Sequence, residues 1–352
     1  MEPKNFRFEV LDCFRGIFAL IVALFHFDEN FQVLFPGYLA VDFFLILSGF
    51  VLSHRYLFKE TPVSIPKFIV NRFARLYPLH VFSLLVFLLF NYWAWQFNPF
   101  EAKHSILKLF QNLTLSHIIG HTMIWNYPSW SVSVEFWVNM VFIFYINKFT
   151  KAHNLFFLAL LGYIVLYLHF GHLDVIGENV FNTFSAGFLR GLNGFFLGII
   201  AYRIYLLLNQ NKLVQKTVYI SIIELLSLSF ITFVALNREF YRDSSDFIVP
   251  FIFLFALPVF AFEKGVISKI LRFTKLKYLG LISYSIYLNH LLVIEVLRFF
   301  FGHNFVYNKE IYIAIYFIAL ITYSTITYLL IEKLFIKLIK NFADKQFNLL
   351  FK

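Results

Sequence analysis

The stretch from Leu11 to Phe27, LDCFRGIFALIVALFHF, decides how the rest of the chain is interpreted. It is apolar over most of its length but carries Asp12 and Arg15 near one end and His26 near the other. In a helix, the step from Arg15 to His26 spans about 16 Å, and at ~100° per residue both side chains lie within about 20° of one face. Ionisable groups at membrane depth are costly and usually face a bundle interior or a water-filled path. Each residue alone could be an interfacial side chain, but the shared face favours a site.

Composition defines the class of protein. Hydrophobic residues make up 60% of the chain and charged residues only 14%. A soluble domain of 352 residues would need far more polar surface. We therefore predict an all-α, polytopic integral membrane helical bundle. The only cysteine is Cys13, which excludes an intramolecular disulfide, and its apolar neighbours disfavour a role as nucleophile.

Ten apolar stretches are long enough to span a bilayer, and an even number puts both termini on one side. With this arrangement, twenty-two basic residues lie on the side of the termini and seven on the other, so the positive-inside rule predicts that both termini are cytoplasmic. The same asymmetry explains the net charge of +10 without nucleic acid. We expect one transmembrane domain, 1–340, an uncleaved first span and a short cytoplasmic tail, 341–352. The predicted spans are 10–27, 38–56, 76–96, 130–147, 154–170, 188–208, 217–236, 247–262, 279–300 and 311–335.

The longest outer segment, about 97–129, contains the amphipathic run HSILKLFQNLTLSHII, which we expect to lie along the membrane interface. His117 and His121 are four residues apart in it, a spacing at which two imidazoles can share a metal. No third ligand lies nearby in the sequence, so we expect no metal site.

Two further motifs place charges near membrane depth. Asp42 lies near the outer end of the second span, in GYLAVDFFLILSGF, at a depth similar to that of His26 on the neighbouring antiparallel helix. A carboxylate there would orient the imidazole and raise its basicity, or would simply cap its own helix. Arg72 and Arg75, in NRFARLYPLH, are three residues apart at the predicted cytoplasmic mouth of the third span. They are equally suited to grip phosphates and to anchor the span, and Pro78 suits a first helical turn.

The remaining polar motifs are expected toward the outer side. Glu135 in PSWSVSVEFW needs a partner at its depth, and Trp130 beside it is either an interfacial residue or a stacking wall for a sugar ring. Arg190 would pair with Glu135, contact an acceptor or mark a helix end. Tyr287 and His290, in SYSIYLNH, belong to a polar stripe that favours a lined cavity.

These motifs together resemble the acyltransferase-3 family of membrane O-acyltransferases. The set LDCFRG with its downstream histidine, GYLAVDFFLILSGF, NRFARLYP, WSVSVE and YSIYLNH occurs in that order over essentially the whole chain. The resemblance implies ten core spans and transfer of an acyl group, usually acetyl from acetyl-CoA, to extracytoplasmic glycans. The family's functional residues fall here on Arg15 and His26, Trp130 and Glu135, and Arg72 and Arg75.

The chain departs from the family pattern at three points. Phe136 stands where a second acidic residue is common, Asn289 replaces a common tryptophan, and Lys333 follows Glu332 where a proline is frequent. Some members carry a fused extracytoplasmic hydrolase-like domain. This chain lacks that domain, so it is expected to act alone or with a separate periplasmic transferase partner.

We therefore predict an O-acetyltransferase of the bacterial inner membrane that modifies an extracytoplasmic or lipid-linked glycan such as O-antigen, capsule or exopolysaccharide. Acetyl-CoA would be the donor, with no permanently bound cofactor and no metal. The alternatives are a glycan-lipid transporter or flippase, a non-acetyl acyltransferase such as a succinyltransferase, and a degenerate member that acts as a scaffold.

The predicted roles divide between donor and acceptor. Arg72 and Arg75 would bind the donor phosphates, and Arg15 would stabilise charge on the thioester oxygen. His26 would be the general base, oriented by Asp42 or Glu135. The sequence is compatible both with direct transfer and with a covalent acyl intermediate. The residues expected near the acceptor are Trp130, Arg190, Tyr287 and His290.

Overall fold

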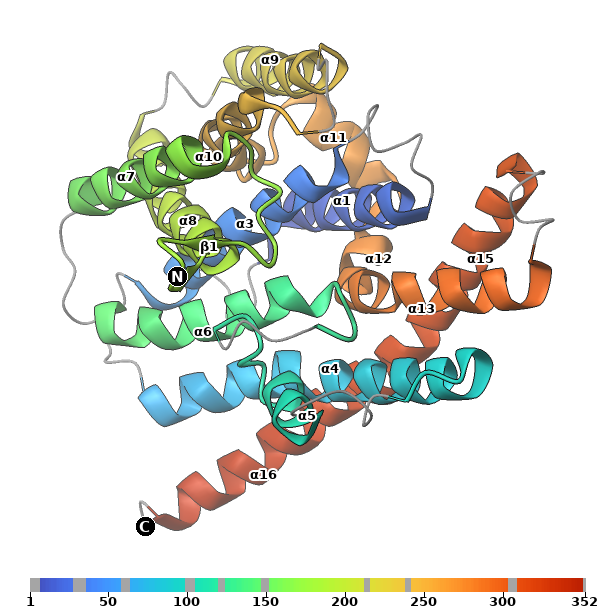
Figure 1. The fold of residues 1–352 in the computed structure, drawn as a ribbon. Helices are drawn as coiled ribbons and strands as arrows, with labels where there is room; N and C mark the ends of the chain where they lie inside the picture. The colour runs from blue at the N-terminus through green and yellow to red at the C-terminus, as the bar shows by residue number, and fades with distance from the viewer. Residues whose placement is uncertain are drawn as a thin grey trace. The chain divides into compact units, whose positions relative to one another are not determined.

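The structure is a computed structural model that describes residues 7–27, 36–57, 64–98, 105–119, 124–146, 152–211, 216–237, 242–302 and 309–350. Nearly all of these residues are helical, and the two short strands form one antiparallel hairpin (Figure 1). The elements are α1 (Glu9–Phe27), η1 (Gly37–Leu39), α3 (Ala40–Tyr56), α4 (Ile65–Trp95), α5 (Ser105–Leu113), α6 (Ser129–Ile146), α7 (Ala152–Phe170), β1 (Asn179–Val180), β2 (Phe184–Ser185), α8 (Ala186–Gln210), α9 (Thr217–Leu236), η2 (Ser244–Ile248), α10 (Val249–Phe260), α11 (Val266–Phe273), α12 (Leu276–Leu281), α13 (Ser283–Phe301), α15 (Lys309–Thr327), η3 (Tyr328–Lys333) and α16 (Leu334–Leu350).

Within the described residues, seven helical segments are long and apolar enough to cross a membrane. Two shorter apolar helices and α6 account for the remaining predicted spans. The prediction of an all-α polytopic membrane protein is confirmed. The seven segments are Glu9–Phe27, Gly37–Tyr56, Ile65–Trp95, Ala186–Gln210, Thr217–Leu236, Ser283–Phe301 and Glu310–Gln346.

One predicted boundary is wrong. Helix α4 begins at Ile65, eleven residues before the predicted start, and Pro78 lies inside it instead of in its first turn. Hydropathy marks the apolar part of a helix, whereas this helix continues through the polar sequence that contains Arg72 and Arg75. Both arginines are therefore held on a regular helical surface.

The chain divides into two compact units. Unit 1 consists of Met1–Lys59 and Lys148–Ser283, and unit 2 of Glu60–Asn147 and Tyr284–Lys352. Unit 1 contains α1, α3 and α7 to α12, and unit 2 contains α4 to α6 and α13 to α16. The predicted tail, 341–352, is helical as far as Leu350 because α16 continues through it.

Glycines set the closest helix approaches in unit 1. A Cβ atom on Gly49 of α3 would overlap the carbonyl oxygen of Phe195 on α8, and one on Gly198 would overlap that of Ile46. On α12, a Cβ on Gly280 would overlap the carbonyl oxygen of Asp12 on α1. Membrane helices use small residues in this way to bring backbones together. The polar end of α1 is thereby held directly against α12.

In unit 2, α4 packs against α6, η3 and α16. An apolar cluster of Leu84, Leu88 and Trp125 lies beneath Leu109 and Leu113 of α5. The segment η3 is a turn of π-helix between α15 and α16. π-Turns often occur at functional positions, and this one carries Glu332, which is 1% exposed.

Candidate functional site

The predicted site residues are divided between the two units, and each set is described within its own unit. Arg15, His26, Asp42 and Arg190 belong to unit 1. The other predicted residues, Arg72, Arg75, Trp130, Glu135, Tyr287 and His290, belong to unit 2.

Helix α1 carries Arg15 and His26 on one continuous helix, as expected. Arg15 donates from Nη1 to Oδ1 of Asp12 at 3.1 Å, and Arg7 also pairs with this carboxylate. The Arg15 side chain is 23% exposed. Asp12, which sequence reasoning did not assign to the site, therefore orients Arg15 toward the start of the helix.

His26 is positioned by its own helix. Its Nδ1 lies 2.9 Å from the carbonyl oxygen of Val22, one turn earlier. A carbonyl oxygen only accepts, so Nδ1 carries the proton and the lone pair of the neutral ring is on Nε2. This tautomer is the one that a general base acting through Nε2 requires.

Asp42 and Arg190 form a buried ion pair. Arg190 donates from Nε to Oδ1 of Asp42 at 3.1 Å and from Nη2 to Oδ2 at 2.6 Å. Its remaining donors reach the carbonyl oxygens of Leu173 and Tyr38, each at 2.7 Å. Both charged side chains are fully buried, and such a planar, two-pronged arrangement is the strongest geometry available to this pair.

This pair bears on two predicted roles. Asp42 accepts from Arg190 on both carboxylate oxygens, and its orientation of His26 stays a prediction. Arg190 is fully buried and pairs with Asp42, a partner that the sequence analysis did not name, and its contact with an acceptor stays a prediction. The physical reason for this pairing is that a charge at this depth needs an opposite charge from a packed neighbour, and α8 packs closely on α3.

Asp246, which lies just before the predicted span 247–262, completes this network. It is fully buried and accepts from the Tyr38 hydroxyl at 2.7 Å and from the Leu173 backbone N–H at 2.9 Å. The carbonyl oxygens of Tyr38 and Leu173 also accept hydrogen bonds from Arg190. The position of this carboxylate next to the apolar start of α10 could have indicated a buried charge. Its partners could not be identified, because they lie far away in the sequence.

In unit 2, Arg75 pairs with Glu332 of η3. Glu332 also accepts from Ser285 at 3.0 Å, and the Arg75 guanidinium lies 5.4 Å from the centroid of the Tyr284 ring. Arg72 differs, because its guanidinium lies over the Phe68 ring at 5.8 Å. The two arginines therefore have different surroundings, which their sequence spacing does not reveal.

Three of the four residues expected near the acceptor, Trp130, Tyr287 and His290, lie on α6 and α13. Ser131 donates to the Tyr287 hydroxyl at 2.8 Å, and both residues are buried, as is the adjacent Trp130. Nδ1 of His290 lies 2.7 Å from the carbonyl oxygen of Tyr287. Glu135 is half-buried on the same helix as Trp130.

Asn289, the position at which the chain departs from the family pattern, lies in a buried network. It accepts from Ser83 at 3.0 Å and donates to Thr327 at 2.9 Å. The amide therefore joins α13 to α4 and α15, a link that an indole could not make because it offers a single donor.

His117 is buried in the turn after α5. Its Nε2 lies 3.3 Å from the carbonyl oxygen of Ser129, and its ring stacks on His80. Burial, and secondly the neighbouring His80, lower the pKa of His117 to about 4, so the ring is neutral at pH 7. His121 lies outside the described residues, among which no group of three metal-ligating side chains occurs.

Replacing Arg75 by alanine is expected to destabilise the protein by about 3 kcal/mol, because it leaves the carboxylate of Glu332 buried without its charge partner. Thermal unfolding of the purified full chain in detergent checks this. Lys67→Ala, which removes an exposed ion pair with Asp344 from the same helix, is the comparison, with a smaller expected loss. Adding Glu332→Gln to Arg75→Ala should recover much of the stability. An Arg75→Ala protein as stable as the parent but with weakened donor binding would instead support the predicted phosphate contact.

Comparisons with known proteins agree with this organisation. Two curated relatives match: "Protein 2 in picA locus" of Rhizobium radiobacter is 29% identical over 46% of this chain and 93% of its own length, and "Putative acetyltransferase ORF330" of Acidianus two-tailed virus is 29% identical over 80% of this chain and 82% of its own length. No solved structure matches. The family described as an acyltransferase domain matches residues 8–332, nearly the whole helical core. The chain therefore belongs to the acyltransferase-3 family and is a membrane acyltransferase.

Proposed function

We propose that this acyltransferase moves an acetyl group from cytoplasmic acetyl-CoA to a hydroxyl of an extracytoplasmic or lipid-linked glycan. The printed name of the viral relative, an acetyltransferase, supports acetyl over other acyl groups. The acceptor class follows from the family resemblance. Neither a metal nor a resident cofactor has a step in this scheme.

The observation that carries the proposal is the 2.9 Å contact between Nδ1 of His26 and the carbonyl oxygen of Val22. With Nδ1–H donated to Val22, Nε2 can take the proton of an acceptor hydroxyl. The hydroxyl oxygen then attacks the thioester carbon, the carbon–sulfur bond breaks, and the proton passes from His26 to the departing CoA thiolate. Each cycle returns His26 to its neutral form.

The geometry changes the role that we assign to Arg15. The two side chains begin about 16 Å apart along α1, and Arg15 points to Asp12. An oxyanion held close to Nε2 of His26 is beyond hydrogen-bonding distance of Arg15 in this rotamer. We therefore assign Arg15 to the polar part of the donor, where its charge guides acetyl-CoA, and not to the oxyanion of the transfer step.

On the donor side, we assign the phosphate contacts to Arg72 and Arg75, which lie three residues apart on α4. On the acceptor side, Trp130, Tyr287 and His290 offer aromatic surface and hydrogen-bonding groups on neighbouring turns. These are the groups that stack and orient a sugar ring.

Transfer of radiolabelled acetyl from acetyl-CoA by the purified full chain tests the proposal. The expected product is a base-labile label in the glycan or glycan-lipid fraction supplied as acceptor. Transfer from succinyl-CoA but not acetyl-CoA would identify a succinyltransferase. Glycan-lipid translocation without any transfer would identify a transporter, and a requirement for an added periplasmic extract would reveal a separate transferase partner.

We also propose a bacterial cytoplasmic-membrane location with both termini in the cytoplasm. The asymmetry of twenty-two to seven basic residues supports it. A fluorescent-protein fusion after Lys352 is expected to be active, and an alkaline phosphatase fusion at the same position inactive. The opposite result would contradict the topology.

A further inference from the structure

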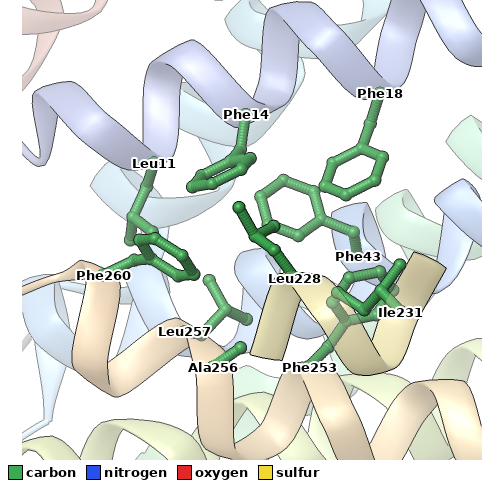
Figure 2. Close-up of a pocket in the computed structure, with 10 residues that line it drawn as sticks. All are labelled: Leu11, Phe14, Phe18, Phe43, Leu228, Ile231, Phe253, Ala256, Leu257 and Phe260. Carbon is green, nitrogen blue, oxygen red and sulfur yellow. The ribbon is translucent and has the colours of Figure 1, made fainter. Parts of the chain in front are cut away.

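Unit 1 contains an apolar pocket that the proposed reaction does not use. It is a half-open apolar hollow among α1, α3, α9 and α10, and its empty space of about 290 Å³ includes space open to the surroundings. Figure 2 shows its lining side chains. Leu11, Phe14 and Phe18 line it from α1, and Leu228 and Ile231 line it from α9. All ten lining side chains are hydrocarbon, so the pocket suits an alkyl chain and offers nothing to a sugar or a nucleotide.

One wall of the pocket faces outward. Only 22% of the apolar window of α9 is buried, and its Leu225 and Leu226 are 54% and 62% exposed. A span of this kind lies against lipid. Because the same helix contributes Leu228 and Ile231 to the pocket, we expect bilayer chains beside it.

A basic amphipathic segment, Lys264 to Tyr278, adjoins the pocket. It contains five basic side chains: Lys264, Lys269, Arg272, Lys275 and Lys277. Its helix α11 also exposes large apolar side chains, Val266 (51%), Ile270 (58%) and Phe273 (92%). This combination is typical of a helix that lies in the interface of an anionic membrane.

Two sets of contacts hold this segment beside the pocket. The carboxylate of Glu224 on α9 accepts the backbone N–H groups of Ile267 (3.0 Å) and Ser268 (3.3 Å) at the start of α11. At the other end, Glu9 pairs with Arg272 (3.6 Å) and Lys277 (3.9 Å). Glu9 lies two residues before the pocket residue Leu11, so the charged segment lies near the Leu11 end of the pocket.

We propose that unit 1 binds an anionic phospholipid of the surrounding bilayer, with one acyl chain in the pocket between α1 and α9 and its phosphate at Lys269 and Lys275. Within the described residues, ion pairs with Glu9 occupy Arg272 and Lys277, whereas Lys269 and Lys275 form none. Glu263 also lies 4.0 Å from Arg272. The lipid would brace the helix that carries Arg15 and His26.

Photo-crosslinking tests the proposal on the full chain in nanodiscs. The probe is phosphatidylglycerol with a diazirine on one acyl chain, compared with the same chain on phosphatidylcholine. Mass spectrometry of the unaltered protein is expected to find adducts on pocket residues with phosphatidylglycerol. The double variant Lys269→Gln/Lys275→Gln should reduce them about thirtyfold, since each lysine near an anionic surface contributes about 1 kcal/mol.

Matched variants distinguish lipid bound in the pocket from lipid that contacts other parts of the protein surface. Leu228→Trp fills the pocket and should abolish the pocket adducts, while Leu225→Trp, on the exposed face of the same helix, should leave them unchanged. Lys333→Gln/Lys337→Gln, an exposed pair in unit 2, is the charge control.

Three results would overturn the proposal: equal labelling by both lipids, adducts on exposed faces only, or displacement of the probe by palmitoyl-CoA but not acetyl-CoA. The last result would assign the pocket to the donor's acyl chain. The adducts of the unaltered protein need no variant to fold, and no outcome depends on acetyl transfer. Failure here would therefore leave the proposed reaction standing.

Discussion

His26→Ala is expected to slow acyl transfer by about 10²–10⁴-fold, the usual contribution of a positioned general base. The reason is the arrangement seen on α1, where the Val22 carbonyl leaves Nε2 as the basic nitrogen. The measurement is transfer of labelled acetyl by detergent-purified protein at matched abundance. Membrane insertion should be retained, because the replacement makes the first span more apolar.

Three comparisons sharpen this prediction. Leu24→Ala, a half-buried position on the same helix, should keep nearly normal turnover. Added imidazole should restore part of the rate of His26→Ala, which a merely structural role would not permit. Arg15→Ala should act mainly on the Michaelis constant for acetyl-CoA, because we assign it to the donor. Near-normal turnover of His26→Ala would move the base to another residue, with Glu135 and His290 the next to test.

Arg190→Leu is expected to cost about 3–5 kcal/mol of stability, since it leaves the carboxylate of Asp42 buried without a partner. The same replacement removes the donors to the carbonyl oxygens of Tyr38 and Leu173. The measurement is thermal and denaturant unfolding of the full chain in detergent. The expected result is a large drop in midpoint and a smaller monodisperse fraction.

The controls for this prediction use the same chemistry in other surroundings. Arg242 pairs with Asp174 at 3.1 Å but is 53% exposed, so Arg242→Leu should cost no more than about 1 kcal/mol. Asp42→Leu combined with Arg190→Leu should be less destabilised than the two single changes predict together, because apolar replacement of a whole buried pair is often nearly neutral. An Arg190→Leu protein as stable as the parent would show that the pair is not structural.

Several elements follow from local sequence. The predicted spans 10–27 and 217–236 agree with α1 and α9 to within one residue. Hydropathy and helical period are properties of neighbouring residues, so the shared helix of Arg15 and His26 could be predicted. The start of α4 could not be predicted in this way, because hydropathy marks only the apolar part of a helix and this helix extends beyond that part.

The sequence by itself determined which charged residues are unfavourable to bury and therefore need a partner. Three charged residues lie in or beside apolar runs: Asp42, Arg190 and Glu332. Each needs a partner, because an unpaired charge in an apolar environment is unfavourable. Only the tertiary structure decided the partners, which are 148 residues apart for Asp42 and Arg190 and 257 apart for Arg75 and Glu332. Any oppositely charged residue could stabilise such a buried charge, so the identity of the partner depends on which helices pack together. That packing depends on small residues such as Gly49 and Gly198, whose effect exists only once two helices meet.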